Sequence, residues 1–481
     1  MGTMNKLRWA MDGGFWDLDI STPVTLEGEA RAVPGHPLPL GVSRGTKLSR
    51  PKQTDFFQRF MFAPFLPSYS YSPASSSHSF NLQRCLAIPL SQDWIAMLQG
   101  QFNLHKFVSS LRKRRTLLQS SDSQSSSLIP AICACLRDKS LYALGIYSEL
   151  SLTPQDTLVL SSDANGNDDT PPRRKAVLHH EFPDHNLTLE AASPSLFLDK
   201  SGNYWDVPLS LALDLASIPS SSGASYHFCM RHIAGLPKLF EGGDENHGKT
   251  IPATLLPGIT LRHAISFKKN LEIWRSEAKK LKMVQPFDIF LSTPHVSASG
   301  IIGAVMTASH GDNSVASEVD DSHSTAAGFS YRSHALKSAV HADLFSSVSF
   351  MAQHGSFQKW FLDLTRFHVR LNFPSGRKFL SGATQLAHDF VNSQQPTNKA
   401  LEAICPSATI SLQQQIVGPF SFRVDSGVTV GLNKQTNWYA QAHDPVFALE
   451  YALQVLGSAK AIAWYSPKQR EFLVELRFFE T

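Results

Sequence analysis

The chain has 481 residues and a net charge of +4, with 42% hydrophobic, 10% aromatic and 17% charged residues. This charge is too mild for a nucleic-acid-binding protein, in which a strong basic bias supplies most of the affinity. The charged fraction lies below the roughly 25% usual in soluble globular proteins. Together with 31 Phe residues, the low charge favours a protein that contacts lipid.

Residues 1–80 are predicted to form an N-terminal region that is partly irregular. Its start contains Asp12, Asp17 and Asp19 and no apolar run, so neither a secretory signal nor a transit peptide is expected. The region carries a first basic cluster, which consists of Arg44, Lys47, Arg50 and Lys52. Because guanidinium groups suit phosphate oxygens, this cluster is a candidate site for an anionic lipid headgroup, with a solvated loop as the alternative.

Residues 81–481 are predicted to form a β domain, because apolar and polar residues alternate in many segments. The clearest segments are 94–104, 209–216, 261–268, 367–373, 447–455 and 472–478. They are about ten residues long, which is the length that a tilted strand needs to cross a bilayer. No segment has the roughly 20 consecutive apolar residues of a transmembrane helix, and the nearest run, 296–309, is short.

Three segments are predicted to be helical, namely 105–119, 128–139 and 382–393. The first two form an insertion between strands, at about 105–139. The first of them carries a second basic cluster, made of Arg112, Lys113, Arg114 and Arg115, which is a further candidate headgroup site. A third basic cluster consists of Arg173, Arg174 and Lys175.

The last residues of the chain indicate how the sheet ends. Phe472, Val474, Leu476 and Phe478 alternate with polar residues, so the chain finishes on an amphipathic strand. An open sheet would leave the backbone groups of such a strand unpaired, whereas a closed barrel has no edge. We therefore predict an all-β fold, a closed antiparallel transmembrane β-barrel of about 12 to 18 strands with short helices near one mouth. The alternative is a soluble sheet with its apolar face inward.

No motif indicates a reaction, so neither catalysis nor a cofactor or metal is expected. The segment 243–250 matches the phosphate-loop pattern, but Pro252 follows closely and Asp244 and Glu245 stand where phosphates would lie. Adjacent His179 and His180 would point to opposite faces of a strand and so would not share a metal ion. The five scattered cysteines are expected to be buried, reduced thiols.

Several long stretches carry a resemblance to a known family. They include "WDLDISTPVTLEGEARAVPG", "YWDVPLSLALDLAS", "SLQQQIVGPFSF" and "YSPKQREFLVELRFFET". With them the chain resembles the trigalactosyldiacylglycerol 4 family of plant chloroplast outer-envelope proteins over nearly its full length.

The resemblance implies a non-enzymatic β-barrel that binds phosphatidic acid and moves lipid from the endoplasmic reticulum to the plastid for galactolipid synthesis. It implies an inner-envelope ABC-type lipid importer, with its lipid-binding subunit, as the partner. It places the chain in the chloroplast outer envelope membrane, with endoplasmic reticulum contact sites as one location, and it leaves a homodimer open. Two alternatives remain, namely a soluble β-rich lipid-binding protein and a scaffold at an envelope contact site.

Overall fold

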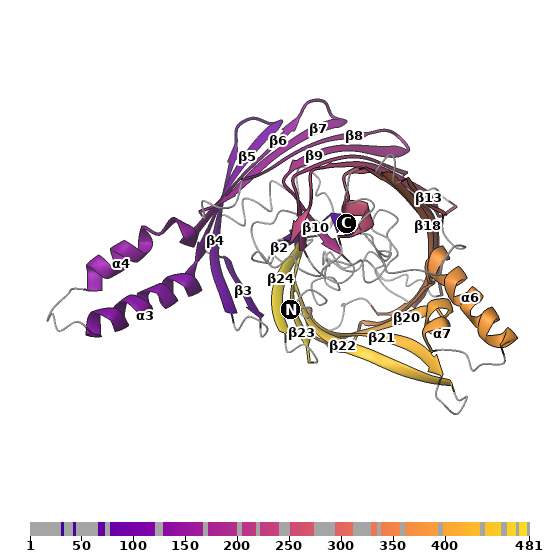
Figure 1. Ribbon diagram of the computed structural model, residues 1–481. Coiled ribbons are helices and arrows are strands. Elements are labelled where there is room, and N and C mark those ends of the chain that lie inside the picture. The colour runs from indigo at the N-terminus through magenta and orange to yellow at the C-terminus, as the bar shows by residue number, and fades with distance from the viewer. Residues whose placement is uncertain are drawn as a thin grey trace.

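The computed structural model consists of a large antiparallel sheet, a small second sheet and a few helices (Figure 1). It describes residues 30–32, 42–44, 66–72, 77–120, 128–166, 172–199, 204–217, 222–239, 251–273, 294–310, 329–333, 338–355, 361–392, 398–432, 438–453, 459–467 and 471–478. The expectation of a mostly β chain with few helices is confirmed.

The first half of the large sheet runs from the N-terminal strands to the middle of the chain. Its strands are β3 (Leu66–Ser72), β4 (Ser77–Pro89), β5 (Trp94–Asn103), β6 (Tyr142–Ser151), β7 (Asp156–Asn165), β8 (Arg173–Glu181), β9 (His185–Ser193), β12 (Leu209–Ser217) and β13 (Ala224–Ala234). Each pairs antiparallel with the next. β3 and the first residues of β4 lie before residue 81, and whether residues 1–80 form a separate region stays a prediction.

The second half of the sheet continues the same antiparallel pairing. Its strands are β15 (Gly258–Glu272), β16 (His295–His310), β18 (Ser338–His354), β19 (Thr365–Asn372), β20 (Ser407–Val417), β21 (Phe420–Leu432), β22 (Trp438–Leu453), β23 (Ala459–Ser466) and β24 (Glu471–Phe478). A short strand, β17 (Phe329–Ser333), pairs with β18. The connection between β20 and β21 is short, and Gly418 there adopts a φ of 51°, which glycine tolerates at no steric cost.

The two ends of the sheet meet at β3 and β24. Two residue pairs join these strands, Tyr71 with Phe472 and Ser70 with Leu473. β2 (Val42–Arg44) pairs with the other end of β24 in parallel. The predicted C-terminal strand therefore exists and is paired on both sides, but the seam is too short to establish closure of the whole sheet.

The alternation of strand directions gives the sheet two different rims. β5 and β19 point to the same rim, because an even number of antiparallel steps separates them. We call this end the helix rim, since α3 (Leu104–Ser120) and α4 (Leu128–Leu136) follow β5, and α6 (Gly376–Val391) and α7 (Asn398–Ile404) follow β19. At the opposite end, the turn rim, short turns close the β4–β5, β6–β7, β8–β9 and β20–β21 hairpins.

The helices agree closely with the sequence patterns. α3 covers the first segment predicted within the insertion, whereas α4 ends at Leu136, three residues before the predicted end at 139. Figure 1 shows the two helices projecting from the sheet side by side. α6 begins six residues before the predicted start, because Ser375 caps it and accepts a hydrogen bond from the backbone N–H of Lys378. The part of the chain that the structure describes contains no helix long and apolar enough to span a membrane.

A small four-stranded sheet lies against the concave face of the large one. It consists of β1 (Ala30–Ala32), β10 (Ser195–Asp199), β11 (Tyr204–Val207) and β14 (Lys238–Leu239). Phe197 and Trp205 pack with Ile233 of β13 and Leu255 of the short 3₁₀ helix η2 (Ala253–Leu255), all nearly inaccessible. Figure 1 shows β10 inside the ring of strands. We call the face of the large sheet that carries this small sheet the inward face.

Candidate functional site

The large sheet has its apolar side chains on the outward face and its polar side chains on the inward face. β16 shows this clearly, since its buried residues include His295, Ser297 and Ser299. These buried residues alternate along β16 with more exposed ones. For example, Ile302 is 62% exposed, whereas the adjacent Ile301 is 3% exposed. A soluble sheet has the opposite arrangement, with the polar face in water.

Exposed apolar residues continue around the sheet. Strands from β4 to β23 contribute them. The residues are Leu86, Ile88, Leu144, Ile146, Leu160, Leu189, Leu211, Met230, Ile265, Phe267, Met306, Leu344, Val348, Phe350, Phe367, Leu371, Leu412, Phe422, Leu449 and Tyr465. They share the outward face, because each lies opposite another outward residue in the strand register. Contiguous apolar surface of this extent marks contact with a membrane or another protein.

The inward face holds a buried charged network on β20, β21 and β22. Arg423 binds both oxygens of Asp425, with Nε 3.0 Å from Oδ1 and Nη2 2.8 Å from Oδ2. Its Nη1 lies 3.4 Å from Oε1 of Glu450, and Gln413 donates a hydrogen bond to Oε2 of the same carboxylate. The guanidinium also lies over the ring of Trp464, 5.2 Å from the ring centre, which is within the reach of a cation–π contact. Since Arg423 and Glu450 are both inaccessible to solvent, each depends on the other for stabilisation.

A second polar contact group lies on the inward face of β18 and β19. Arg366 donates two hydrogen bonds to Oε1 of Gln353, from Nε at 2.9 Å and from Nη2 at 2.6 Å. On β12 and β13, Nε2 of His227 lies 2.6 Å from Oδ1 of Asp214. The inward face is therefore polar in both halves of the sheet.

Ion pairs connect the small sheet to the large one near the helix rim. Nη2 of Arg173, at the start of β8, lies 3.1 Å from Oδ1 of Asp206 in β11. Burial raises the pKa of Asp206 above its ordinary value, and the charge of Arg173 opposes part of this shift. The guanidinium of Arg231 in β13 lies over the Phe197 ring, 5.0 Å from its centre. These contacts hold the small sheet against the inward face.

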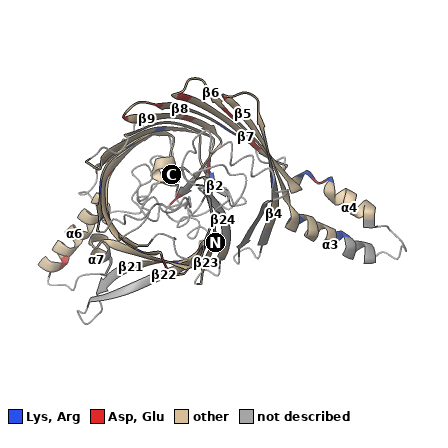
Figure 2. Cartoon of the chain, turned by 180° about the vertical axis from the view of Figure 1, so that it is seen from behind, with Lys and Arg blue, Asp and Glu red and all other residues tan. Residues whose placement is uncertain are grey.

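The two rims differ in charge along β4 to β9. Described basic residues at or beyond the helix rim are Lys106, Arg112, Lys113, Arg114, Arg137, Lys139, Arg173 and Arg174. The turn rim of the same strands carries Asp93, Asp156, Glu181 and Asp184. Figure 2 shows blue residues on α3 and in the segment that follows α4, where a red residue also lies, and red residues at the far ends of the neighbouring strands. This asymmetry favours contact between the helix rim and an anionic surface.

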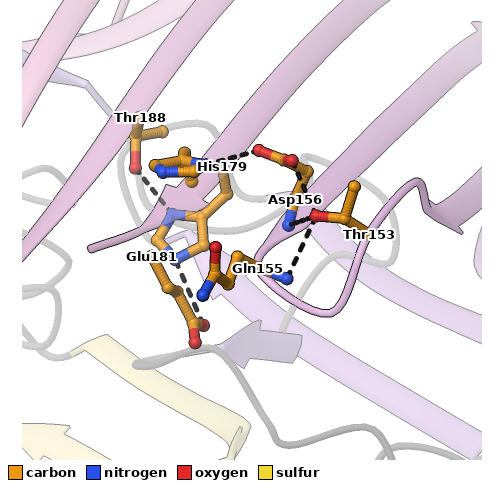
Figure 3. A network of polar contacts seen from close by, with 7 residues as sticks. Thr153, Gln155, Asp156, His179, Glu181 and Thr188 are labelled. Atoms are coloured by element: carbon orange, nitrogen blue, oxygen red, sulfur yellow. Dashed lines mark hydrogen bonds and ion pairs between the residues drawn. The ribbon is translucent and has the colours of Figure 1, made fainter. Parts of the chain in front are cut away.

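The two adjacent histidines lie at the turn rim and point to opposite faces of β8. Nδ1 of His180 lies 2.5 Å from Oδ1 of Asp156, and Asp156 also accepts a hydrogen bond from the hydroxyl of Thr153. His179 contacts Thr188 and Glu181 instead (Figure 3). The two side chains therefore have separate partners, and no group of three metal-ligating side chains occurs within the described residues.

Only part of the two predicted headgroup clusters belongs to the described residues. Arg112, Lys113 and Arg114 are exposed on α3, while for Arg115 and for Arg44 of β2 only the backbone is described. Lys47, Arg50 and Lys52 lie outside the described residues, as does the phosphate-loop match at 243–250. β2 pairs with β24, and β3 and β4 stand between it and the strand that leads into α3. The role of both predicted clusters in headgroup binding stays a prediction.

The charged residues of the inward face were not singled out from the sequence. A sequence pattern that could have revealed them is the recurrence of polar residues at every second position, which marks one face of a hairpin. These residues are Gln413, Gln415, Ser421, Arg423 and Asp425. Among the described side chains, the thiols of Cys133, Cys135, Cys229 and Cys405 are free, but only Cys135 and Cys229 are buried as expected, while Cys133 is exposed.

A comparison with curated proteins gives a strong match over the whole chain. The chain is 52% identical over 486 residues to "Protein TRIGALACTOSYLDIACYLGLYCEROL 4, chloroplastic" of Arabidopsis thaliana, with 99% of this chain and 100% of that protein covered. The chain belongs to the trigalactosyldiacylglycerol 4 family. The resemblance expected from the sequence is therefore confirmed.

Two other comparisons add little to this assignment. No protein-family model matches the chain. Among solved structures, a "Bacterial polysaccharide outer membrane secretin" aligns with 86% of this chain and 97% of its own, at a TM-score of 0.33 and 8% identity. The description of the fold does not depend on this likeness.

Proposed function

We propose that the chain is a non-enzymatic lipid-transfer protein whose large sheet is a closed antiparallel β-barrel in the chloroplast outer envelope membrane. The observation that carries the proposal is the apolar outward face beside the polar, charged inward face. A strand that crosses a bilayer turns apolar residues to lipid and polar residues to the interior. Hydrocarbon also demands that every backbone group be paired, which a closed sheet achieves.

Closure is supported by the strand order. The strands β3 to β9, β12, β13, β15, β16 and β18 to β24 follow one another by antiparallel pairing and number eighteen. An even number lets the last strand meet the first in the antiparallel sense, which is the sense of the β3–β24 pairs. The small sheet on the inward face then lies within the barrel.

The lipid in this proposal is phosphatidic acid, carried from the endoplasmic reticulum to the plastid for galactolipid synthesis. The relative's name, which contains a galactolipid and the word chloroplastic, supports the compartment and the lipid class. The basic residues at the helix rim support an anionic headgroup. In this proposal Arg44, Lys47, Arg50 and Lys52, with Arg112, Lys113, Arg114 and Arg115, contact the headgroup.

The energy for directional transport comes from outside this chain. We assign this energy to an inner-envelope ABC-type importer, whose lipid-binding subunit receives lipid from the barrel. We place the chain at contact sites with the endoplasmic reticulum. A homodimer is compatible with this arrangement. A pull-down of the intact chain from solubilised envelopes, read by the recovery of the importer's subunits, tests the partner.

The function is tested with purified full-length protein and native mass spectrometry. We expect retained phosphatidic acid, and transfer of that lipid between vesicles at a rate above that of vesicles alone. Extraction of membranes with alkaline carbonate should leave the protein in the membrane. Protein released by alkali but still lipid-bound would indicate a soluble lipid-binding protein. Protein that holds no lipid would instead be a scaffold, and the proposed function would be wrong.

A further inference from the structure

The outward face of the sheet is hollowed between β6 and β13. The hollow has a volume of about 570 Å³ and adjoins a second one of about 420 Å³, and both are lined by Ala176 and Ala191. These two alanines are opposite each other on β8 and β9 and form the floor. The walls are leucines, among them Leu160, Leu178 and Leu211. Volumes of this size are typical of small-molecule sites.

The strand register shows that this hollow opens outward. Arg231 contacts Phe197 of the small sheet, so Met230, next to it in β13, points to the other face. Met230 is opposite Leu213, which is opposite Leu189 on β9. The hollow is therefore continuous with the apolar outward wall and separate from the charged inward face.

One end of the hollow is basic. Arg174 lines the smaller hollow and is exposed. Its guanidinium makes no hydrogen bond or ion pair with any residue that the structure describes. Its neighbours across β7 and β9 are Ser162 and Ser193, which line the same hollow. The adjacent Arg173 and Lys175 point inward instead, where they pair with acidic residues of β11 and β9.

The placement of charge along the hollow matches a phospholipid. Arg174 lies at the helix rim, and Leu178, four residues further along β8, lies about 13 Å deeper in the sheet at the usual rise per strand residue. The only carboxylate among the lining residues, that of Glu190, is bound to Lys175 on the inward side, 2.9 Å away. An anionic group at the rim therefore meets one guanidinium, and a chain that extends from it meets mainly alanine and leucine, with Met230 and His232 on the β13 side.

We propose that one anionic phospholipid lies in this hollow, with its phosphate on Arg174 and an acyl chain over Ala176 and Ala191. The proposal rests on the proposed function and names a binding position on the outer wall of the sheet. Arg174 supplies a forked donor to the phosphate oxygens. The alanine floor supplies the depth that a chain needs below the surrounding leucines.

The test compares two substitutions at the hollow with two matched controls. Arg174→Gln removes the charge, and Ala191→Phe fills the floor. Arg84→Gln removes another exposed outward arginine on β4, and Ala298→Phe adds the same bulk to the outward face of β16; neither lies at the hollow. Full-length proteins are loaded with dioleoyl phosphatidic acid or dioleoyl phosphatidylcholine, and the retained lipid is counted by native mass spectrometry.

We expect Arg174→Gln to lower the retention of phosphatidic acid about 10-fold, the effect of losing one charge-assisted hydrogen bond, and Arg174→Lys to restore part of it. Ala191→Phe should displace the same lipid, and both controls should retain it. If all four variants hold as much phosphatidic acid as the unsubstituted protein, the hollow is not the site, while the proposed function stands. If the unsubstituted protein retains none, both proposals are wrong.

Discussion

Ile301 and Ile302 are adjacent in β16, yet Ile301 is buried against Phe345 on the inward face and Ile302 is 62% exposed on the outward face. Gly303 makes room for this packing, since a Cβ there would lie 2.4 Å from the Phe345 ring. Two identical side chains thus have opposite environments one residue apart. This difference in exposure gives a direct way to test which face of the large sheet contacts lipid.

Ile302→Lys should destabilise the protein in a bilayer by about 2–4 kcal/mol, because it places a charge on the lipid face near the middle of a strand. The measurement is urea unfolding of protein reconstituted in lipid vesicles. Ile302→Leu is the control and should behave like the unsubstituted protein. Equal stability of the Lys and Leu variants would mean that this face does not contact hydrocarbon.

The strands and helices could largely be predicted from the sequence, because local periodicity determines them. The alternating segment 261–268 lies within β15, and the basic segment 105–119 lies within α3. The segment 296–309, the most nearly helix-like apolar run, forms most of β16 because its small residues suit a strand with serines on one face. Periodicity alone does not say which face is outward, since a soluble sheet has the same period.

Long-range features could not be predicted in the same way. The small sheet consists of strands of two to five residues, which are too short to carry a period, and β1 and β10 pair across more than 160 residues. The charged network of Arg423 depends on three strands lying in register, so single-strand patterns reveal its members but not their contacts. The same limit applies to the hollow at Arg174, which six strands create together.

The network around Arg423 should respond very differently to single and combined substitutions. Arg423→Met leaves Asp425 and Glu450 as buried carboxylates without their guanidinium, and we expect a loss of about 3–5 kcal/mol in the free energy of unfolding. The triple variant Arg423→Met, Asp425→Asn, Glu450→Gln removes all three charges and should recover most of that loss. Denaturant unfolding in detergent measures both. A triple variant as unstable as the single one would show that packing, not charge, dominates here.

The basic surface of α3 should bind anionic membranes. Arg112→Glu combined with Arg114→Glu should weaken binding to vesicles that contain phosphatidic acid by at least about 2 kcal/mol, or roughly 30-fold. Each lost basic residue near such a surface contributes about 1 kcal/mol, and each new carboxylate is repelled by it. Binding to phosphatidylcholine vesicles should be unchanged. The matched control is Lys268→Glu with Lys269→Glu, the same change in charge placed near the turn rim of β15. Co-sedimentation with vesicles measures all of these, and equal loss in both double variants would argue against a specific role for α3.

The seam between β3 and β24 decides whether the sheet is closed in the membrane. Ser70 and Leu473 are paired directly across it, and direct antiparallel neighbours have Cα atoms about 4.5–5.5 Å apart, within the range that a disulfide bridges. In a background without the native cysteines, Ser70→Cys with Leu473→Cys should therefore form a disulfide under mild oxidation, read as a shift in gel mobility that a reductant reverses.

The control pair for the seam is Ser70→Cys with Ala463→Cys. Ala463 lies on β23, one strand further from β3, so the two thiols are too far apart to bond in a closed sheet. Cross-linking of the first pair alone, in protein within native membranes, requires β3 and β24 to be neighbours there. Unpaired backbone groups are not tolerated in hydrocarbon. Failure of the first pair to cross-link would therefore mean that the large sheet has an open edge and does not span the bilayer as a barrel.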